Sequence, residues 1–156
     1  MFLESEWKLS KQQSFAEDFV LPDYQKLSVK NILPQIGAIF DAESFSSSGF
    51  PRGYFGDFQK VDKVVLFIFD GLGYNRLLHH LDNHNRTFLE LAEKGTLNPV
   101  TTVFPATSST VLASLFTALS PAQHQILGYH MFSKKYGLVF DTLDMKPVYG
   151  TAAKLS

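Results

Sequence analysis

The sequence predicts an α/β fold, with an open and mostly parallel sheet that carries helices on both of its faces. Residues 64–69 (VVLFIF) form a continuous apolar run, which is typical of a strand covered on both sides in a parallel sheet. Helical patterns over 74–81 and 87–94 follow this run. A second strand pattern over 97–104 leads into a helical pattern over 108–119. This alternation of strand and helix is the rhythm of an open α/β sheet.

The region before the first predicted strand is less regular. Residues 1–27 mix charges with scattered aromatic rings. We interpret residues 1–59 as an N-terminal lead-in that packs on a domain formed by residues 60–156. A helix is expected around Pro34, which fits its first turn because the missing N–H costs little there. Residues 44–56 are rich in Ser, Gly and Phe and predict a loop.

The later elements carry their own signals. The helix over 108–119 has an apolar stripe that is expected to be buried, and Pro121 lies just after its end, where helices commonly stop. A short strand is expected over 138–143. The alternation of strand and helix still continues where the sequence stops, so we expect a domain that is incomplete at its C-terminal side. The apolar stripe expected on the helix over 108–119 consists of Val111, Leu112, Leu115, Phe116 and Leu119.

Composition excludes several classes of function. The 156 residues suffice for one domain, and 45% hydrophobic with 19% charged residues is typical of a globular protein. A net charge of −1 gives no electrostatic signature for nucleic acid or an anionic membrane. The absence of cysteine excludes disulfides, thiolate zinc sites and cysteine nucleophiles. No signal peptide or membrane-spanning run is recognisable, so a cytoplasmic location is expected.

Asp70 comes directly after the first apolar run, at the expected carboxyl end of a buried strand. Ligands bind at this edge in open α/β sheets. A carboxylate there is costly unless it meets a cation or hydrogen-bond donors, and a metal ion supplies such a partner. A hairpin turn at Asp70-Gly71 is disfavoured by the helical pattern that follows. A dinucleotide-binding loop beginning at Gly71 and Gly73 is disfavoured by Arg76, where a third glycine is needed.

Four consecutive hydroxyl residues, Thr107 to Thr110, precede the helix over 108–119. The ordinary interpretation is a helix N-cap, a position that Ser and Thr favour. The functional interpretation uses the same place, because free N–H groups and the positive end of the helix dipole suit a phosphate group. A metal-activated serine or threonine hydroxyl there is a good nucleophile. Taken alone, this stretch favours the cap.

Three segments together resemble the alkaline phosphatase superfamily and, within it, the type I phosphodiesterase/nucleotide pyrophosphatase family. They are residues 64–73, 102–108 and 117–129. The family writes the last segment as Thr-Gly-Leu-x-Pro-x-x-His-Gly-Ile, and Ala118 and Gln125 replace its two glycines. The order and spacing of the three segments make the resemblance more specific than any one of them.

This resemblance implies an alkaline-phosphatase-like sheet and metal-dependent hydrolysis of phosphodiester or pyrophosphate bonds. Asp70 matches the first metal-ligating aspartate. Counting back from Pro121 and His124, the nucleophile that also contacts the metal falls on Ser108, with Thr107 as the neighbour if the count shifts by one. In the family, this hydroxyl attacks phosphorus with the help of two divalent cations, usually Zn²⁺. The expected substrate is a small-molecule phosphoester or nucleotide.

The family needs further Asp and His ligands, far downstream of the nucleophile. After Ser108 the sequence offers His124, His130, Asp141 and Asp144, which match none of the family's ligand motifs. We therefore expect an N-terminal portion of the catalytic domain that is inactive alone. The alternatives are another hydrolase or mutase of the superfamily, such as a phosphomonoesterase or phosphoglycerate mutase, or a non-catalytic binding module. The preference for monoesters or diesters and the oligomeric state stay open.

Overall fold

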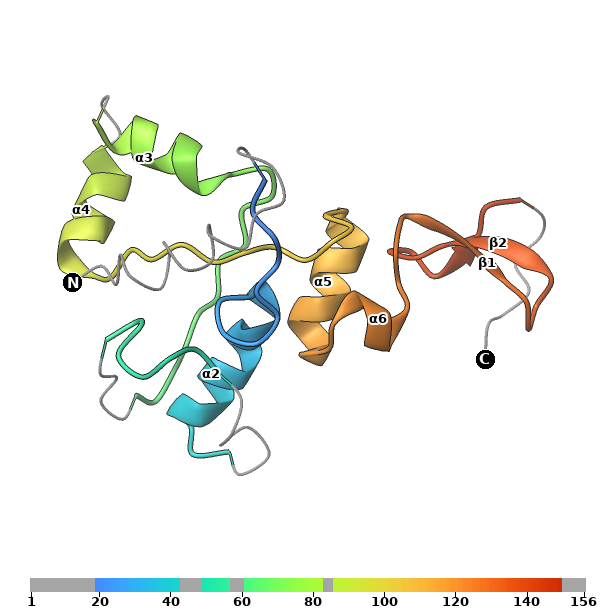
Figure 1. Ribbon diagram of the computed structural model, residues 1–156, viewed down its shortest axis with the longest axis horizontal. Helices are drawn as coiled ribbons and strands as arrows, with labels where there is room; N and C mark the ends of the chain where they lie inside the picture. Colours follow the sequence, from blue (N-terminus) through green and yellow to red (C-terminus); the bar gives the residue numbers. More distant parts are fainter. Residues whose placement is uncertain (1–18, 43–48, 57–60, 83–85, 150–156) are drawn as a thin grey trace.

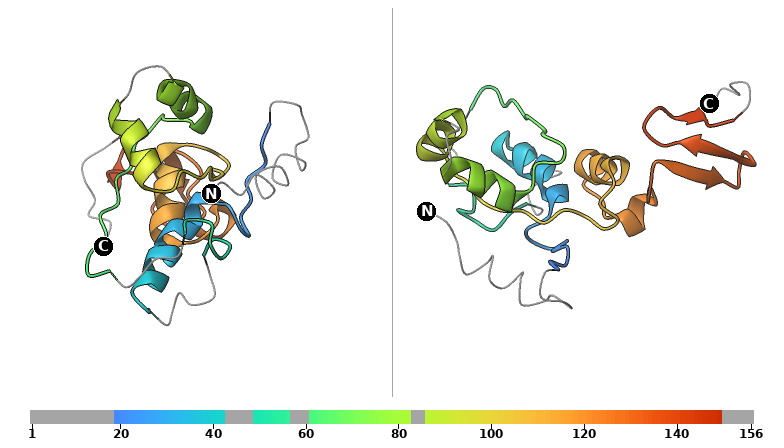
Figure 2. Two further views of the ribbon diagram at one scale, coloured as in Figure 1. Left: turned by 90° about the vertical axis from the view of Figure 1, so that its left-hand side faces the viewer. Right: turned by 90° about the horizontal axis from the view of Figure 1, so that it is seen from above.

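The computed structural model describes residues 19–42, 49–56, 61–82 and 86–149. Figure 1 shows the strands at one end of the molecule, α3 and α4 toward the other, and α5 and α6 between them. The right-hand view of Figure 2 shows the same order from above. In chain order the elements are η1 (Val29–Asn31), α2 (Ile32–Ile39), α3 (Tyr74–Asp82), α4 (Arg86–Lys94), α5 (Ser108–Thr117), α6 (Pro121–His124), β1 (His130–Ser133), β2 (Leu138–Asp141) and β3 (Lys146–Pro147).

The sheet is a three-stranded antiparallel meander with the order β1-β2-β3. In its register His130 faces Asp141 and Ser133 faces Leu138. β2 confirms part of the strand expected over 138–143 but ends at Asp141. It ends there because the Asp141 carboxylate accepts the backbone N–H groups of Leu143 and Asp144, which turns the chain toward β3.

The expected parallel strands over 64–69 and 97–104 do not form in the described structure. Its parallel pairing is a single bridge between Ser28 and Thr101. The prediction of a buried strand at 64–69 is wrong, since Phe67, for example, is 75% exposed. The apolar run favours a strand, but a strand forms only where a neighbour accepts its hydrogen bonds. Helices combined with a sheet are consistent with the α/β class, whereas the described sheet is antiparallel.

The predicted helices are confirmed with small shifts of their ends. α3 and α4 fall on the patterns over 74–81 and 87–94, and α2 places Pro34 in its first turn, where it is buried. α5 begins at Ser108 and ends at Thr117, two residues earlier than expected, because Ala118 adopts a left-handed backbone with φ 58°. The expected loop at 44–56 is described from residue 49, where it forms bends and turns. Residues 43–48 lie outside the described part.

The buried core joins the N-terminal region to the stretch that leads into α5. Its apolar members are Leu27, Tyr54, Val103 and Leu115. The Leu27 carbonyl accepts the Thr101 N–H at 2.6 Å, and the Tyr54 hydroxyl donates to the carbonyl of Pro99. α5 packs against η1 and α2. Residues far apart in the sequence therefore position the start of α5.

The stripe predicted for α5 is only partly correct. Leu115 is buried, but Phe116 is 62% exposed and Leu119 is 38% exposed. The interior side of α5 is instead lined by small hydroxyl residues, which fit the close approach of η1: Ser109, Thr110 and Ser114 are all buried.

Among the described helices, none combines the length and the apolar character that a membrane crossing requires.

Candidate active site

Thr107 caps the N-terminus of α5. Its backbone is extended (φ −83°, ψ 150°), and its Oγ1 accepts the N–H of Thr110 at 3.3 Å. The same oxygen lies 2.8 Å from the Thr110 hydroxyl and 3.3 Å from the Ser109 hydroxyl. This is the geometry of a helix N-cap, in which a side chain satisfies a backbone donor that the helix leaves free. The Thr107 hydroxyl is therefore engaged within its own helix.

Ser108 is the first residue of α5, and its hydroxyl points out of the helix toward Asp70. Ser108 Oγ donates to Asp70 Oδ2 at 2.6 Å. This length is typical of a hydroxyl that donates to a charged carboxylate. Asp70 is exposed, Ser108 is half-buried, and Gly71 turns the chain directly after Asp70 with a positive φ of 72°. The structure thus brings together the two residues that the sequence selected as metal ligand and nucleophile.

Comparison with known families tests the resemblance that these residues suggested. The model of the family "Type I phosphodiesterase / nucleotide pyrophosphatase" matches residues 64–154, which is more than half of the chain. The chain belongs to the type I phosphodiesterase/nucleotide pyrophosphatase family. The resemblance to this branch of the alkaline phosphatase superfamily is confirmed, and the family indicates a hydrolase of phosphodiester or pyrophosphate bonds. No curated protein and no solved structure gives a match to the chain.

The metal chemistry of this family can be compared with the donors present. Ser108 Oγ and Asp70 Oδ2 are two oxygen atoms that face each other at 2.6 Å, and oxygen donors of this kind bind divalent cations. Among the residues that the structure describes, no group of three or more His, Cys, Asp or Glu side chains gathers around one point. The donors therefore fit part of a metal site, and the described residues do not complete it.

His124, in the segment that carries the family pattern, is part of the packing between α5 and α6. Its Nδ1 accepts the N–H of Ile126 at 3.0 Å, which leaves the proton of the neutral ring on Nε2. Nε2 lies 2.8 Å from the hydroxyl of Ser114, a buried residue of α5. Burial lowers the pKa of His124 from its ordinary value of 6.5, while its backbone hydrogen bond acts in the opposite direction. Both nitrogens thus have structural partners.

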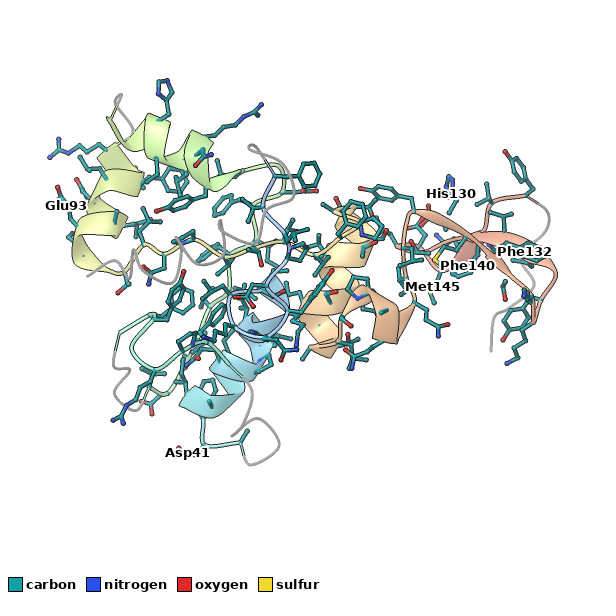
Figure 3. All side chains as sticks on the ribbon, in the orientation of Figure 1. Asp41, Glu93, His130, Phe132, Phe140 and Met145 are labelled. Carbon is teal, nitrogen blue, oxygen red and sulfur yellow. The ribbon has the colours of Figure 1, made fainter. Side chains whose placement is uncertain are left out.

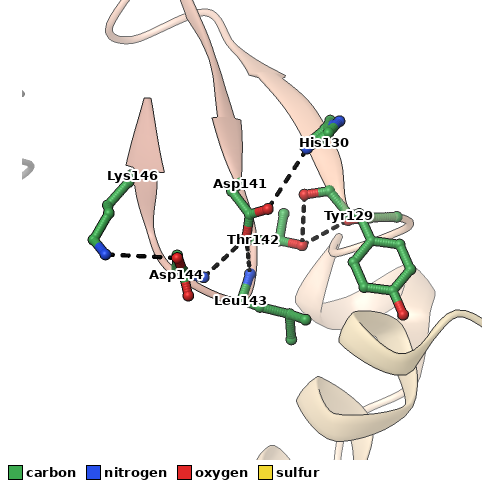
Figure 4. Close-up of polar contacts among 8 residues, drawn as sticks. Tyr129, His130, Asp141, Thr142, Leu143, Asp144 and Lys146 are labelled. Carbon is green, nitrogen blue, oxygen red and sulfur yellow. Dashed lines mark hydrogen bonds and ion pairs between the residues drawn. The ribbon is translucent and has the colours of Figure 1, made fainter. Parts of the chain in front are cut away.

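The other downstream candidates form contacts within the sheet (Figure 4). His130 Nε2 lies 3.5 Å from Asp141 Oδ2, and Asp144 Oδ2 lies 3.5 Å from the Lys146 ammonium group. The backbone N–H groups of Asp144 and Leu143 hold the pKa of the Asp141 carboxyl below its ordinary value. Figure 3 shows His130 near Phe132, Phe140 and Met145, at the end of the molecule opposite Glu93. These side chains thus have partners within the sheet and in the turn after β2.

Ala118 and Gln125 stand where the family pattern has glycine, and the structure shows why glycine suits these places. Both residues adopt left-handed backbone conformations, with φ values of 58° and 62°. Ala118 ends α5, and Gln125 ends α6 with its N–H bonded to the carbonyl of Pro121. A left-handed residue commonly ends a helix, and glycine adopts this conformation without steric cost. Despite the two substitutions, the chain still takes the turns that glycine favours.

Proposed function

We propose that this chain supplies the nucleophile and one metal ligand for metal-dependent hydrolysis of phosphodiester or pyrophosphate bonds. Ser108 is the nucleophile and Asp70 is the ligand. The observation that carries the proposal is the 2.6 Å hydrogen bond from Ser108 Oγ to Asp70 Oδ2. It joins two residues 38 positions apart, both inside the region that matches the family.

The geometry favours Ser108 over Thr107 as the nucleophile. The Thr107 oxygen accepts the Thr110 N–H as an N-cap, so an attack through it requires opening the first turn of α5. The Ser108 hydroxyl makes no such bond to its own helix and donates to the Asp70 carboxylate. A hydroxyl that is not bonded to its own helix and lies beside a candidate metal ligand can be activated by a bound cation.

The reaction that these groups support is an in-line displacement at phosphorus. Ser108 Oγ would form a bond to phosphorus while the bond to the leaving oxygen breaks and the leaving oxygen keeps the electron pair; the Ser108 proton would pass to water, because Asp70 would be engaged as a metal ligand. The N-terminus of α5 favours the negative charge of the phosphate group. Divalent cations of the kind that the family uses, usually Zn²⁺, neutralise phosphate charge and lower the pKa of the hydroxyl when bound. Water then cleaves the phosphoserine ester and regenerates the Ser108 hydroxyl.

A complete metal site needs more ligands than Asp70 and Ser108. The family's two-cation chemistry requires further carboxylate and imidazole donors, and the described residues gather no such group. We therefore propose that the 156-residue chain alone has negligible hydrolase activity. Measurable Zn²⁺-dependent turnover of bis(p-nitrophenyl) phosphate by the purified chain contradicts this part of the proposal.

The roles are tested in the longer catalytic domain that this proposal requires, assayed on bis(p-nitrophenyl) phosphate with and without Zn²⁺. Ser108→Ala is expected to lower kcat by about a thousandfold or more, because a nucleophile has no substitute. Asp70→Asn is expected to lower both activity and Zn²⁺ affinity. Thr107→Ala is the matched control and should keep most of the kcat. Full activity of Ser108→Ala together with loss in Thr107→Ala assigns the nucleophile to Thr107, and full activity of both excludes this mechanism.

A further inference from the structure

Residues 64–69, which we call the apolar segment, run as an extended ribbon toward the start of α3 (Figure 1). Their backbone forms no hydrogen bond with another residue of the described structure. The side chains of one face are 60% to 75% exposed, and those of the other face are 38% to 50% exposed. The first face carries Val65, Phe67 and Phe69, and the second carries Val64, Leu66 and Ile68.

This combination is unusual for a folded protein, because unpaired edges and apolar side chains are normally covered. The apolar segment has six β-branched, aromatic or leucine residues without charge, proline or glycine. Such a segment has the composition of strands that pair with identical strands. Its free N–H and C=O groups are the template for that pairing. Phe69 contacts the ring of Phe88 edge-on with centroids 6.1 Å apart, but the segment is otherwise open to a partner.

The charges at the two ends of the apolar segment indicate which partner fits. Lys63 precedes it and Asp70 follows it. If a second copy of the segment runs antiparallel with Lys63 opposite Asp70, every apolar residue faces an apolar residue and both ends carry opposite charges. A parallel pair in register places Lys63 beside Lys63, which is unfavourable. We propose that the apolar segment pairs antiparallel with the same segment of a second copy of this chain, in the register that sets Lys63 against Asp70.

The register also determines the kind of assembly. It sets an odd-numbered residue opposite an even-numbered one, so that Val65 lies on the same face as Ile68 of the second copy. A closed pair with two-fold symmetry places identical residues of both strands on the same face, which this register does not allow. The second copy therefore keeps a free edge, to which a third copy can add. The assembly is open-ended and grows with protein concentration.

The first experiment measures the molar mass of the purified 156-residue protein by size exclusion with light scattering, across a series of concentrations. The mass is expected to rise with concentration, and thioflavin T fluorescence with it. Phe67→Lys places a charge in the middle of the apolar segment and should keep the protein monomeric. Leu91→Lys is the matched control, because Leu91 is 62% exposed on α4 and lies outside the segment. Circular dichroism confirms that both variants keep their helices.

The second experiment tests the register. Lys63→Asp sets like charges against each other at both ends and is expected to weaken association about tenfold. The double variant Lys63→Asp with Asp70→Lys exchanges the two charges and should restore association. A wild-type protein that stays monomeric at every concentration overturns the proposal, as does a Phe67→Lys variant that associates like the wild type. A double variant that associates as weakly as Lys63→Asp alone overturns the antiparallel register.

Discussion

Two neighbouring hydroxyls at the start of α5 hold different positions. Thr107 Oγ1 accepts the Thr110 N–H inside the helix, whereas Ser108 Oγ donates to Asp70 on another segment. Their side chains have similar chemistry, so the difference comes from their place in the turn. The N-cap residue lies beside the free backbone donors, and the next residue projects outward. Thr107 is therefore expected to contribute to the stability of the fold, and Ser108 to the proposed catalysis.

Removing the cap should destabilise the fold more than removing the proposed nucleophile. Thr107→Ala leaves the Thr110 N–H without its acceptor and is expected to lower the free energy of unfolding by about 1 kcal/mol. Ser108→Ala removes a hydroxyl whose partner, Asp70, is exposed to water, and should change stability by less than about 0.5 kcal/mol. Urea unfolding followed by circular dichroism measures both, with Thr107→Ser as the control that keeps the cap. A larger loss of unfolding free energy in Ser108→Ala than in Thr107→Ala contradicts this prediction.

His124 makes the packing of α6 on α5 sensitive to pH. Its neutral ring donates from Nε2 to Ser114 and accepts the Ile126 N–H at Nδ1. When the ring takes up a second proton on Nδ1, this nitrogen can no longer accept the Ile126 N–H, and the hydrogen bond is lost. Burial also disfavours the charged ring. α5 and α6 contain no other titratable side chain that compensates for this charge.

The pKa of His124 is lower in the folded protein than its ordinary value of 6.5. Between the two values the unfolded chain binds more protons, so acid favours unfolding. The stability contributed by His124 is therefore complete above pH 6.5, is lost as the pH falls below this value, and changes no further below the folded pKa. Urea unfolding of wild type and His124→Gln from neutral to acid pH measures the difference. An equal loss of stability in both proteins excludes this role.

At the scale of elements, the helices and part of the strand expected over 138–143 were predictable, whereas the expected parallel strands over 64–69 and 97–104 do not form in the described structure. The patterns behind α3, α4 and α5 lie within each helix, so a local stretch of sequence is sufficient to identify them. The run over 64–69 has the composition of a strand, but its pairing depends on residues elsewhere, and no described segment pairs with it. The contact between Asp70 and Ser108 was foreseeable from the order of motifs. The capping contacts of Thr107, which favour Ser108 as the proposed nucleophile, depend on the three-dimensional fold and could not be predicted from the sequence.

The ends of α5 and α6 provide a test of backbone conformation. Ala118 and Gln125 both have positive φ values, which costs a residue with a Cβ atom about 1 kcal/mol or more. Ala118→Gly and Gln125→Gly are each expected to raise the free energy of unfolding by about 0.5–1 kcal/mol, since relief of strain exceeds the added chain entropy. Ala113→Gly, inside α5, is the control and should lower it by about 1 kcal/mol. Urea unfolding that shows a loss in all three variants contradicts the interpretation.

At the scale of the whole molecule, the family region and the folding unit do not coincide. The family match begins at residue 64, yet half of the buried apolar core, Leu27 and Tyr54, lies before it. The Ser28–Thr101 bridge and the contact of α5 with η1 also cross this boundary. The N-terminal region therefore supports the stretch that carries Ser108 toward Asp70, although none of its described residues belongs to the candidate site.

This arrangement predicts that residues 60–156 do not fold alone. Without residues 1–59, α5 loses its packing against η1 and α2, which should expose buried side chains such as Leu115, at about 2 kcal/mol for each buried apolar side chain, in a domain stabilised by only about 5–15 kcal/mol. Thermal unfolding followed by circular dichroism should show no cooperative transition for residues 60–156. In the intact chain, Leu27→Ala should lower the free energy of unfolding by about 2–5 kcal/mol, while Gln25→Ala, at an exposed neighbour, leaves it unchanged. A cooperative transition of residues 60–156 at the temperature of the intact chain contradicts the shared core.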